Sequence, residues 1–170
     1  EMFITGYPPE DLILRDDLLD QAYEAVVRLG EEKPESFIVV GYPKKEGNSI
    51  YNCAGVLRNK SIVTEYKKQE LPNYEVFDEK RYFQPGNSVG IFEVNGYRVA
   101  LSVCEDIWHE KVINQAHESK ANLLLNINLV LLALRRNPWP TDLQRQRSNL
   151  EASAYMTFLT PESLPGASSR

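Results

Sequence analysis

The sequence of 170 residues is poor in the side chains that build disulfide frameworks and zinc sites. It contains two cysteines, Cys53 and Cys104, and two histidines, His109 and His117. Two cysteines so far apart do not form a disulfide framework, which favours a reducing, cytoplasmic setting. No pair among these four residues has the spacing of zinc ligands, so no metal site is predicted.

A hydrophobic run long enough to cross a membrane is also missing. The apolar segment 123–134 is too short and contains Asn126 and Asn128. The formal net charge is −5 and there is no basic cluster, which argues against nucleic acid or an anionic membrane surface as the main partner. The chain opens at Glu1 with what reads as the end of a strand, so we expect no signal peptide and a chain that is a fragment.

The residues that are present predict one α/β domain, since 42% of them are hydrophobic and can bury a core. Hydrophobic spacing predicts a helix that Asp16 or Asp17 caps and that Gly30 ends. Alternation, turn residues and helical spacing predict the other elements: strands 37–41, 49–57, 61–64, 91–94, 97–103 and 121–128, and a helix over 111–120. The strand, helix and strand around Cys104 predict a βαβ unit.

The stretch 99–108 carries the strongest candidate for chemistry. An apolar run introduced by Asn95-Gly96 stops at Cys104 and two acids, which predicts a buried strand that delivers the cysteine to its C-terminal edge. The α/β sheets place their active sites at such edges. A thiol is a nucleophile only as the thiolate and needs a nearby base or cation, and an inert core cysteine is the alternative. We expect Cys53, in the middle of a strand, to serve packing only.

Four segments together resemble the nitrilase superfamily, and most of all the glutaminase domains of glutamine-dependent NAD synthetases. These segments are 1–12, 68–83, 104–108 and 126–128, and the second lies in a loop rich in aromatic residues, a kind of loop that often carries binding residues. The resemblance implies an α/β fold, a nitrilase-like α-β-β-α sandwich that we expect to be incomplete at both ends. It covers residues 1–128 as a partial carbon-nitrogen hydrolase domain.

The resemblance also implies a catalytic triad in which Glu1 is the general base, Lys68 the cation and Cys104 the nucleophile. Lys68 would favour the thiolate and, with the backbone N–H of Glu105, stabilise the oxyanion. Glu1 would take the thiol proton and later activate water. Lys67 is the competing lysine, but the family places its lysine at the position that Lys68 occupies.

Further residues carry roles implied by the resemblance, each with an alternative. Tyr74 matches a tyrosine that lines the family's glutamine pocket. Trp108 stands where the family has an aromatic residue, so it belongs to the pocket or to the core. Glu79 orients the lysine or belongs to a solvated charge run over 78–81. A Cys-His pair using His109 would need a special turn to reach back.

Residues 129–170 break the resemblance. They hold none of the nine lysines and five of the ten arginines, and Val130 stands where the family has a serine that contacts glutamine. No strand with its turn is visible there, so we expect a divergent tail that is disordered or frame-shifted and does not complete the sheet. A sheet with exposed edges predicts a chain that is marginally stable.

The expected function is therefore glutamine hydrolysis through a Cys104 thioester, which would supply ammonia to a separate NAD synthetase domain for the amidation of deamido-NAD. The resemblance implies no cofactor for the glutaminase reaction, ATP and magnesium in the synthetase domain, and a homo-oligomeric full-length protein. Two alternatives stay open: a free-standing nitrilase-type amidase and a catalytically inactive fragment.

Overall fold

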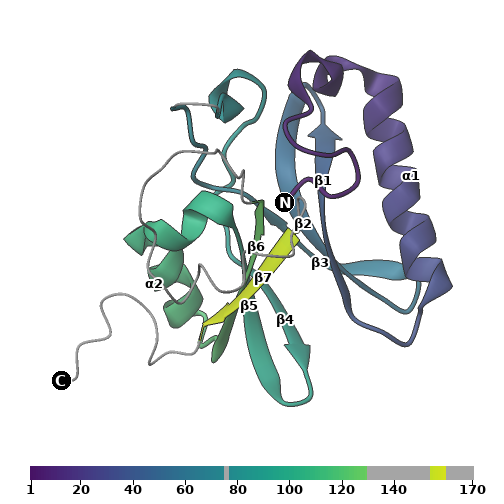
Figure 1. The fold of residues 1–170 in the computed structure, drawn as a ribbon. Coiled ribbons are helices and arrows are strands. Elements are labelled where there is room, and N and C mark those ends of the chain that lie inside the picture. Colours follow the sequence, from purple (N-terminus) through teal and green to yellow (C-terminus); the bar gives the residue numbers. More distant parts are fainter. Residues whose placement is uncertain (75–76, 130–153, 160–170) are drawn as a thin grey trace, which may run out of the picture.

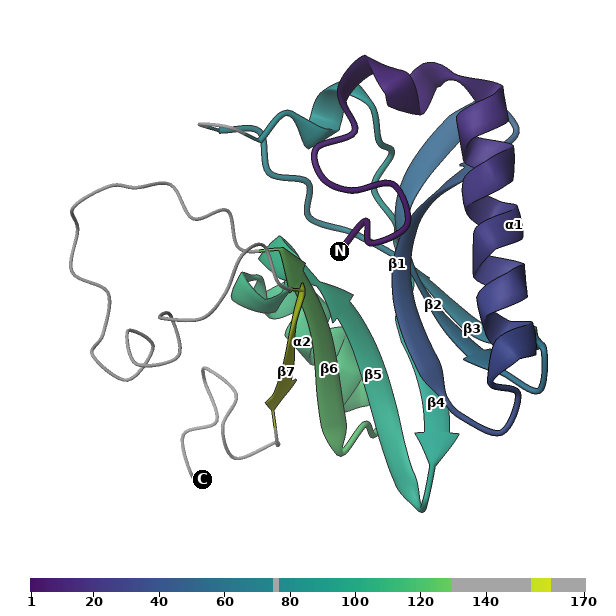
Figure 2. The ribbon, with the colours of Figure 1, turned by 45° about the vertical axis from the view of Figure 1, so that its right-hand side comes forward.

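The computed structural model describes residues 1–74, 77–129 and 154–159. These residues form four layers, with helix α1 on one outer face, helix α2 on the other and two sheets between them (Figures 1 and 2). None of the helices in these ranges is long and apolar enough to cross a membrane.

The first helix and sheet come from the first 67 residues. They comprise η1 (Glu10–Leu14), α1 (Asp16–Glu32), β1 (Ile38–Glu46), β2 (Ser49–Arg58) and β3 (Ser61–Lys67). The three strands pair antiparallel in the order β1-β2-β3. The predicted hairpin 49–64 is therefore confirmed, and the strand predicted over 37–41 extends to Glu46.

The second sheet holds the predicted βαβ unit. The elements are η2 (Glu79–Arg81), β4 (Gly90–Val94), β5 (Tyr97–Val103), η3 (Cys104–Trp108), α2 (Glu110–Glu118), β6 (Leu123–Leu129) and β7 (Ala154–Leu159). The strand order is β4-β5-β6-β7, and β5 and β6 are parallel as their connection through α2 requires. Asn95 and Gly96 both have positive φ, 50° and 81°, which is the geometry of the predicted tight hairpin turn.

Alternating side chains of the strands build the layers. Ala54, Val56 and Leu101 point into the core between the two sheets, together with side chains of β3, β4 and β6. Their neighbour Cys53 points to the opposite face and packs with Val26 of α1. Ala100, Ala116 and Leu124 form the contact between α2 and the outer face of the second sheet. The alternation confirms the predicted α-β-β-α sandwich.

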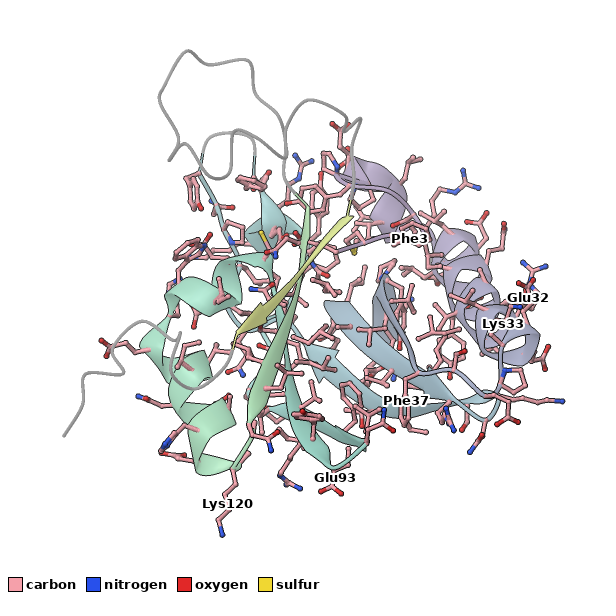
Figure 3. All side chains as sticks on the ribbon, turned by 60° about the horizontal axis from the view of Figure 1, so that its bottom comes forward. Phe3, Glu32, Lys33, Phe37, Glu93 and Lys120 are labelled. Atoms are coloured by element: carbon pink, nitrogen blue, oxygen red, sulfur yellow. The ribbon has the colours of Figure 1, made fainter. Side chains whose placement is uncertain are left out.

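The edges of the core are closed by aromatic and charged side chains. The ring of Phe37 lies 5.7 Å from that of Phe92, and the guanidinium of Arg58 covers it at 4.6 Å. Figure 3 shows Phe37 at the end of the sandwich and the charged Glu93 and Lys120 pointing away from it.

Two local predictions near the N-terminus are wrong. Residues 3–5 form a turn and not the end of a strand. Helix α1 begins at Asp16, its N-cap is Arg15, and no side chain caps it by a hydrogen bond. Asp17 instead forms an ion pair with Arg15, at 2.5 Å, so the first acidic side chains support the helix by charge rather than by capping.

The expectation that residues 129–170 add no strand is also wrong. Leu129 ends β6, and Ala154–Leu159 form β7, which pairs antiparallel with β6 from Leu124↔Leu159 to Leu129↔Ala154. The sequence AYMTFL is rich in residues that favour strands, and this signal was outweighed by the surrounding Arg, Ser and Pro. The rest of the predicted tail lies outside the described residues.

Candidate active site

The predicted catalytic residues come from three elements that meet at one end of the sandwich. Lys68 directly follows β3, Cys104 directly follows β5, and Glu1 lies beside β1. Gly41 of β1 allows this approach, because a Cβ there would stand only 2.7 Å from the Met2 nitrogen and 2.9 Å from the Glu1 carbonyl carbon. Strands from two different sheets therefore deliver the lysine and the cysteine to one place.

Lys68 lies between two carboxylates. Its Nζ is 2.6 Å from Glu1 Oε1 and 2.9 Å from Glu79 Oε1. Glu1, Lys68 and Glu79 are 5%, 1% and 2% exposed. Burial of three charged groups is costly unless they are paired and hydrogen-bonded, as they are here. Glu79 is thus not part of a solvated charge run, although its neighbours Asp78 and Lys80 are exposed.

Asn52 of β2 completes the cluster, and the sequence analysis did not find it. Its side-chain amide donates to Glu1 Oε1 at 3.1 Å and to Glu79 Oε1 at 3.4 Å. Its backbone carbonyl accepts from the Lys68 N–H at 2.8 Å. The only available signal was a polar residue inside a strand that is otherwise apolar at this point.

The charges of this cluster set its protonation. Burial opposes the charge of Lys68, but Glu1 and Glu79 more than offset this and raise its pKa. Burial raises the pKa of Glu1 while Lys68 lowers it, and the net pKa lies below the usual value. Burial, with a contribution from Glu1, raises the pKa of Glu79 to about 7 despite Lys68. Glu1 is therefore the stable carboxylate of the pair.

Cys104 sits in a strained turn next to this cluster. Its φ is 45°, a conformation that residues with a side chain seldom adopt and that often marks a functional position. Burial and the charge of Glu1 raise the pKa of the thiol to about 12, against the influence of Lys68. Lys68 thus favours the thiolate, as expected, but burial and Glu1 outweigh its influence. Glu1 lies within hydrogen-bonding reach of the thiol.

The competing residues are held elsewhere. Lys67 forms an ion pair with Glu46 at 2.5 Å on the outside of the first sheet. Cys53 is buried, and burial raises its pKa far above the usual value. His109 faces Glu105 at 3.5 Å. In the described ranges, no group of three or more His, Cys, Asp or Glu side chains could hold a metal ion.

The geometry agrees with what comparison with known proteins finds. Residues 1–161 match the carbon-nitrogen hydrolase family. The chain belongs to this family. Its fold matches an amidase from Nesterenkonia sp. of the nitrilase superfamily, with a TM-score of 0.63, 20% identity, and coverage of 72% of this chain and 47% of that one.

Several relatives of this carbon-nitrogen hydrolase are glutamine-dependent NAD(+) synthetases. The protein of Xanthomonas campestris is 40% identical over 127 residues and that of Aquifex aeolicus 39% over 132 residues, which is 74% and 75% of this chain. The structure of the enzyme from Acinetobacter baumannii, in complex with ADP, is 30% identical with a TM-score of 0.72, and the match covers 84% of this chain and 26% of that one. The chain spans 23% of the length of the first two relatives.

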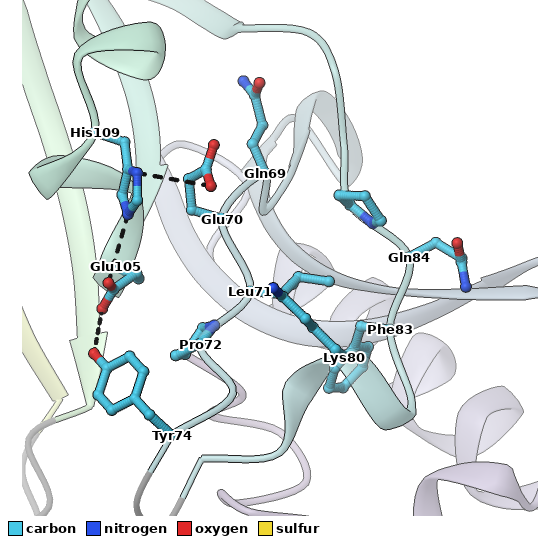
Figure 4. Close-up of a pocket in the computed structure, with 11 residues that line it drawn as sticks. Gln69, Glu70, Leu71, Pro72, Tyr74, Lys80, Phe83, Gln84, Glu105 and His109 are labelled. Carbon is cyan, nitrogen blue, oxygen red and sulfur yellow. Dashed lines mark hydrogen bonds and ion pairs between the residues drawn. The ribbon is translucent and has the colours of Figure 1, made fainter.

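A cavity of about 370 Å³ is lined by Gln69, Lys80 and Glu105, the sequence neighbours of Lys68, Glu79 and Cys104 (Figure 4). Tyr74 and Glu105 line it, and the Tyr74 hydroxyl donates to Glu105 Oε2 at 2.7 Å. Leu71, Phe83 and Lys80 lie across from them. The cavity thus combines an apolar wall with groups of both charges.

The two predicted aromatic residues differ in their placement. Tyr74 is 51% exposed and lines the cavity. Trp108 is 76% exposed, so its alternative placement in the core is wrong. It ends η3, four residues after Cys104. Trp108 does not line the cavity, whereas Tyr74 does.

Proposed function

We propose that this chain is the glutamine-hydrolysing part of a glutamine-dependent NAD synthetase. The observation that carries the proposal is the buried cluster of Glu1, Lys68 and Glu79 beside the strained Cys104. The names of the relatives support glutamine as the source of nitrogen. Ammonia would pass to an ATP- and magnesium-dependent synthetase domain that amidates deamido-NAD, in a full-length protein that is homo-oligomeric and cytoplasmic.

The first half of the reaction forms a thioester. Cys104 Sγ attacks the side-chain amide carbon of glutamine while Glu1 takes the thiol proton. This use of a base fits a thiol whose pKa is about 12, because such a group is protonated at neutral pH. The Lys68 ammonium and the backbone N–H of Glu105 stabilise the oxyanion. The C–N bond then breaks, and the proton held by Glu1 goes to the leaving ammonia.

The second half hydrolyses the thioester. Glu1, again a carboxylate, takes a proton from water as the water oxygen attacks the thioester carbon. The same oxyanion donors serve this step, and collapse of the tetrahedral intermediate breaks the C–S bond. The proton on Glu1 returns to Cys104 Sγ, and glutamate leaves. Tyr74 and Trp108 are assigned to substrate binding, and Glu79 holds Lys68 in place.

The experiment is a comparison of two cysteine variants in an assay of ammonia release from L-glutamine. Cys104→Ala should lower the rate by about a thousandfold or more, because the nucleophile is lost. Cys53→Ala is the matched control and should keep most of the rate, since Cys53 only packs against α1. Equal losses in both variants would contradict the assignment, and faster hydrolysis of simple aliphatic amides than of glutamine would favour the free-standing amidase.

A further inference from the structure

Asp106 is a buried acid that has no role in the reaction proposed above. It lies in η3, two residues after Cys104, and is 0% exposed. A carboxylate in such a place is costly unless its oxygens receive hydrogen bonds. The hydrogen-bond donors around the Asp106 carboxylate therefore indicate its role.

Four donors converge on this carboxylate. Oδ2 accepts from the Val103 N–H at 2.9 Å and from the Tyr66 hydroxyl at 2.9 Å. Oδ1 accepts from the Gln69 N–H at 3.1 Å and from the Glu70 N–H at 2.8 Å. Three of the four are backbone groups, which a change of side chain elsewhere cannot remove.

These donors belong to the two segments that carry the proposed nucleophile and cation. Val103 immediately precedes Cys104, and Gln69 immediately follows Lys68. The segments extend β5 and β3, which lie in different sheets and share no strand pairing. The Asp106 carboxylate accepts backbone N–H groups of both segments and so bridges them.

We propose that Asp106 is a positioning residue that ties the backbone before Cys104 to the backbone after Lys68 and so sets the lysine against the thiol. This inference rests on the proposed function, because it gives Lys68 and Cys104 their roles. Its effect reaches the reaction through these two residues, since Asp106 is buried and its four hydrogen bonds are made to neither Lys68 nor Cys104.

The chemistry of the four contacts makes the conservative variant informative. In Asp106→Asn the oxygen can face Gln69 and Glu70, but the amide group then points its hydrogens at the Val103 N–H, which is itself a donor. The Tyr66 hydroxyl can turn and accept from this amide, so only the contact next to Cys104 is broken. The variant should therefore release the cysteine turn and leave the lysine segment in place.

The test is the rate of Cys104 alkylation by iodoacetamide as a function of pH, in a Cys53→Ala background that leaves one thiol. Lys68→Met should slow alkylation and move the profile to higher pH, because the cation no longer favours the thiolate. Asp106→Asn should move the profile in the same direction. Near neutral pH, its alkylation rate should fall below that of the Cys53→Ala chain by a factor of up to about ten. Tyr66→Phe removes one donor of four and should keep the wild-type profile.

The outcomes separate this inference from the function on which it rests. If Lys68→Met shifts the profile and a folded Asp106→Asn variant does not, the positioning role is overturned and the proposed function stands. If Lys68→Met also has no effect, both are overturned. Thermal unfolding of each variant shows that the measurement is made on folded chains, and a purely structural role would lower the midpoint without moving the pH profile.

A measurement on the unaltered chain covers the case in which Asp106→Asn does not fold. The N–H groups of Val103, Gln69 and Glu70 donate to one carboxylate, Val103 to Oδ2 and the other two to Oδ1, so their hydrogen exchange should be slow and similar in rate. Rates for Gln69 and Glu70 that are fast, while that of Val103 is slow, would show that the two segments open independently and would overturn the inference.

Discussion

Glu79 is a buried acid whose pKa is raised into the physiological range. Burial, with a contribution from the charge of Glu1, raises the pKa of Glu79 from 4.5 to about 7. Its other neighbours are Lys68, Asn52 and Tyr7. The folded chain thus holds the Glu79 proton more tightly than the unfolded chain. Its contribution to the free energy of unfolding is complete below pH 4.5 and is lost as the pH rises through about 7.

The first prediction concerns this loss. Between about pH 5 and pH 8, the unaltered chain should lose on the order of 1–3 kcal/mol more unfolding free energy than Glu79→Gln, whose side chain does not titrate. Urea denaturation at a series of pH values measures both curves. Glu1, whose pKa is lowered, acts in the opposite direction but is present in both proteins. Two parallel curves would show that Glu79 is ionised throughout and that its assigned protonation is wrong.

At the residue scale, only the site residues that belong to a recognised sequence motif could be predicted. The spacing that selects Lys68 over Lys67 is a property of the sequence, and the structure places Lys68 in the buried cluster and Lys67 on Glu46. Asn52 and Asp106 were missed because all their cited contacts except that of Asp106 with Val103 join residues 16 to 51 positions apart. The raised pKa of Cys104 was missed for the same reason, since burial is its first cause.

At the scale of elements, strand β1 contributes to the site because its residue Gly41 has no side chain. Gly41 faces the backbone of Glu1 and Met2 at distances that leave no room for a Cβ. The element was predictable from its apolar run, because period and composition are local signals. The contact with the N-terminal segment was not, because that segment forms a turn where a strand was expected.

Gly41→Ala should therefore displace Glu1 and reduce glutamine hydrolysis by about tenfold to a hundredfold, in line with the cost of moving a catalytic group by about 1 Å. Gly30→Ala is the matched control, because a Cβ at Gly30 in α1 makes only ordinary contacts, the shortest being 3.7 Å to Leu57. The control should keep its activity and gain up to about 1 kcal/mol of stability from the better helix former. Equal activity in both variants would show that Glu1 is not held by Gly41.

For the whole molecule, the residues alone predicted the βαβ unit around Cys104, and the four layers were expected from the family resemblance. Alternating faces of β2, β5 and β6 direct one set of side chains between the sheets and the other set toward the helices, and this alternation is written in the sequence. The addition of β7 to the edge of the second sheet was not predictable in the same way. β7 pairs with β6, which lies many residues earlier in the chain. Whether such a segment forms a strand depends on its pairing partner more than on its own residues.

The central claim is that Cys104 attacks a glutamine side chain, and covalent labelling tests it most directly. A diazoketone analogue of L-glutamine should add once per chain, and peptide mapping by mass spectrometry should place the adduct on Cys104. An excess of L-glutamine should suppress the reaction, and Cys104→Ala should abolish it. An adduct on Cys53, or none on Cys104 while iodoacetamide still labels that thiol, would contradict the account.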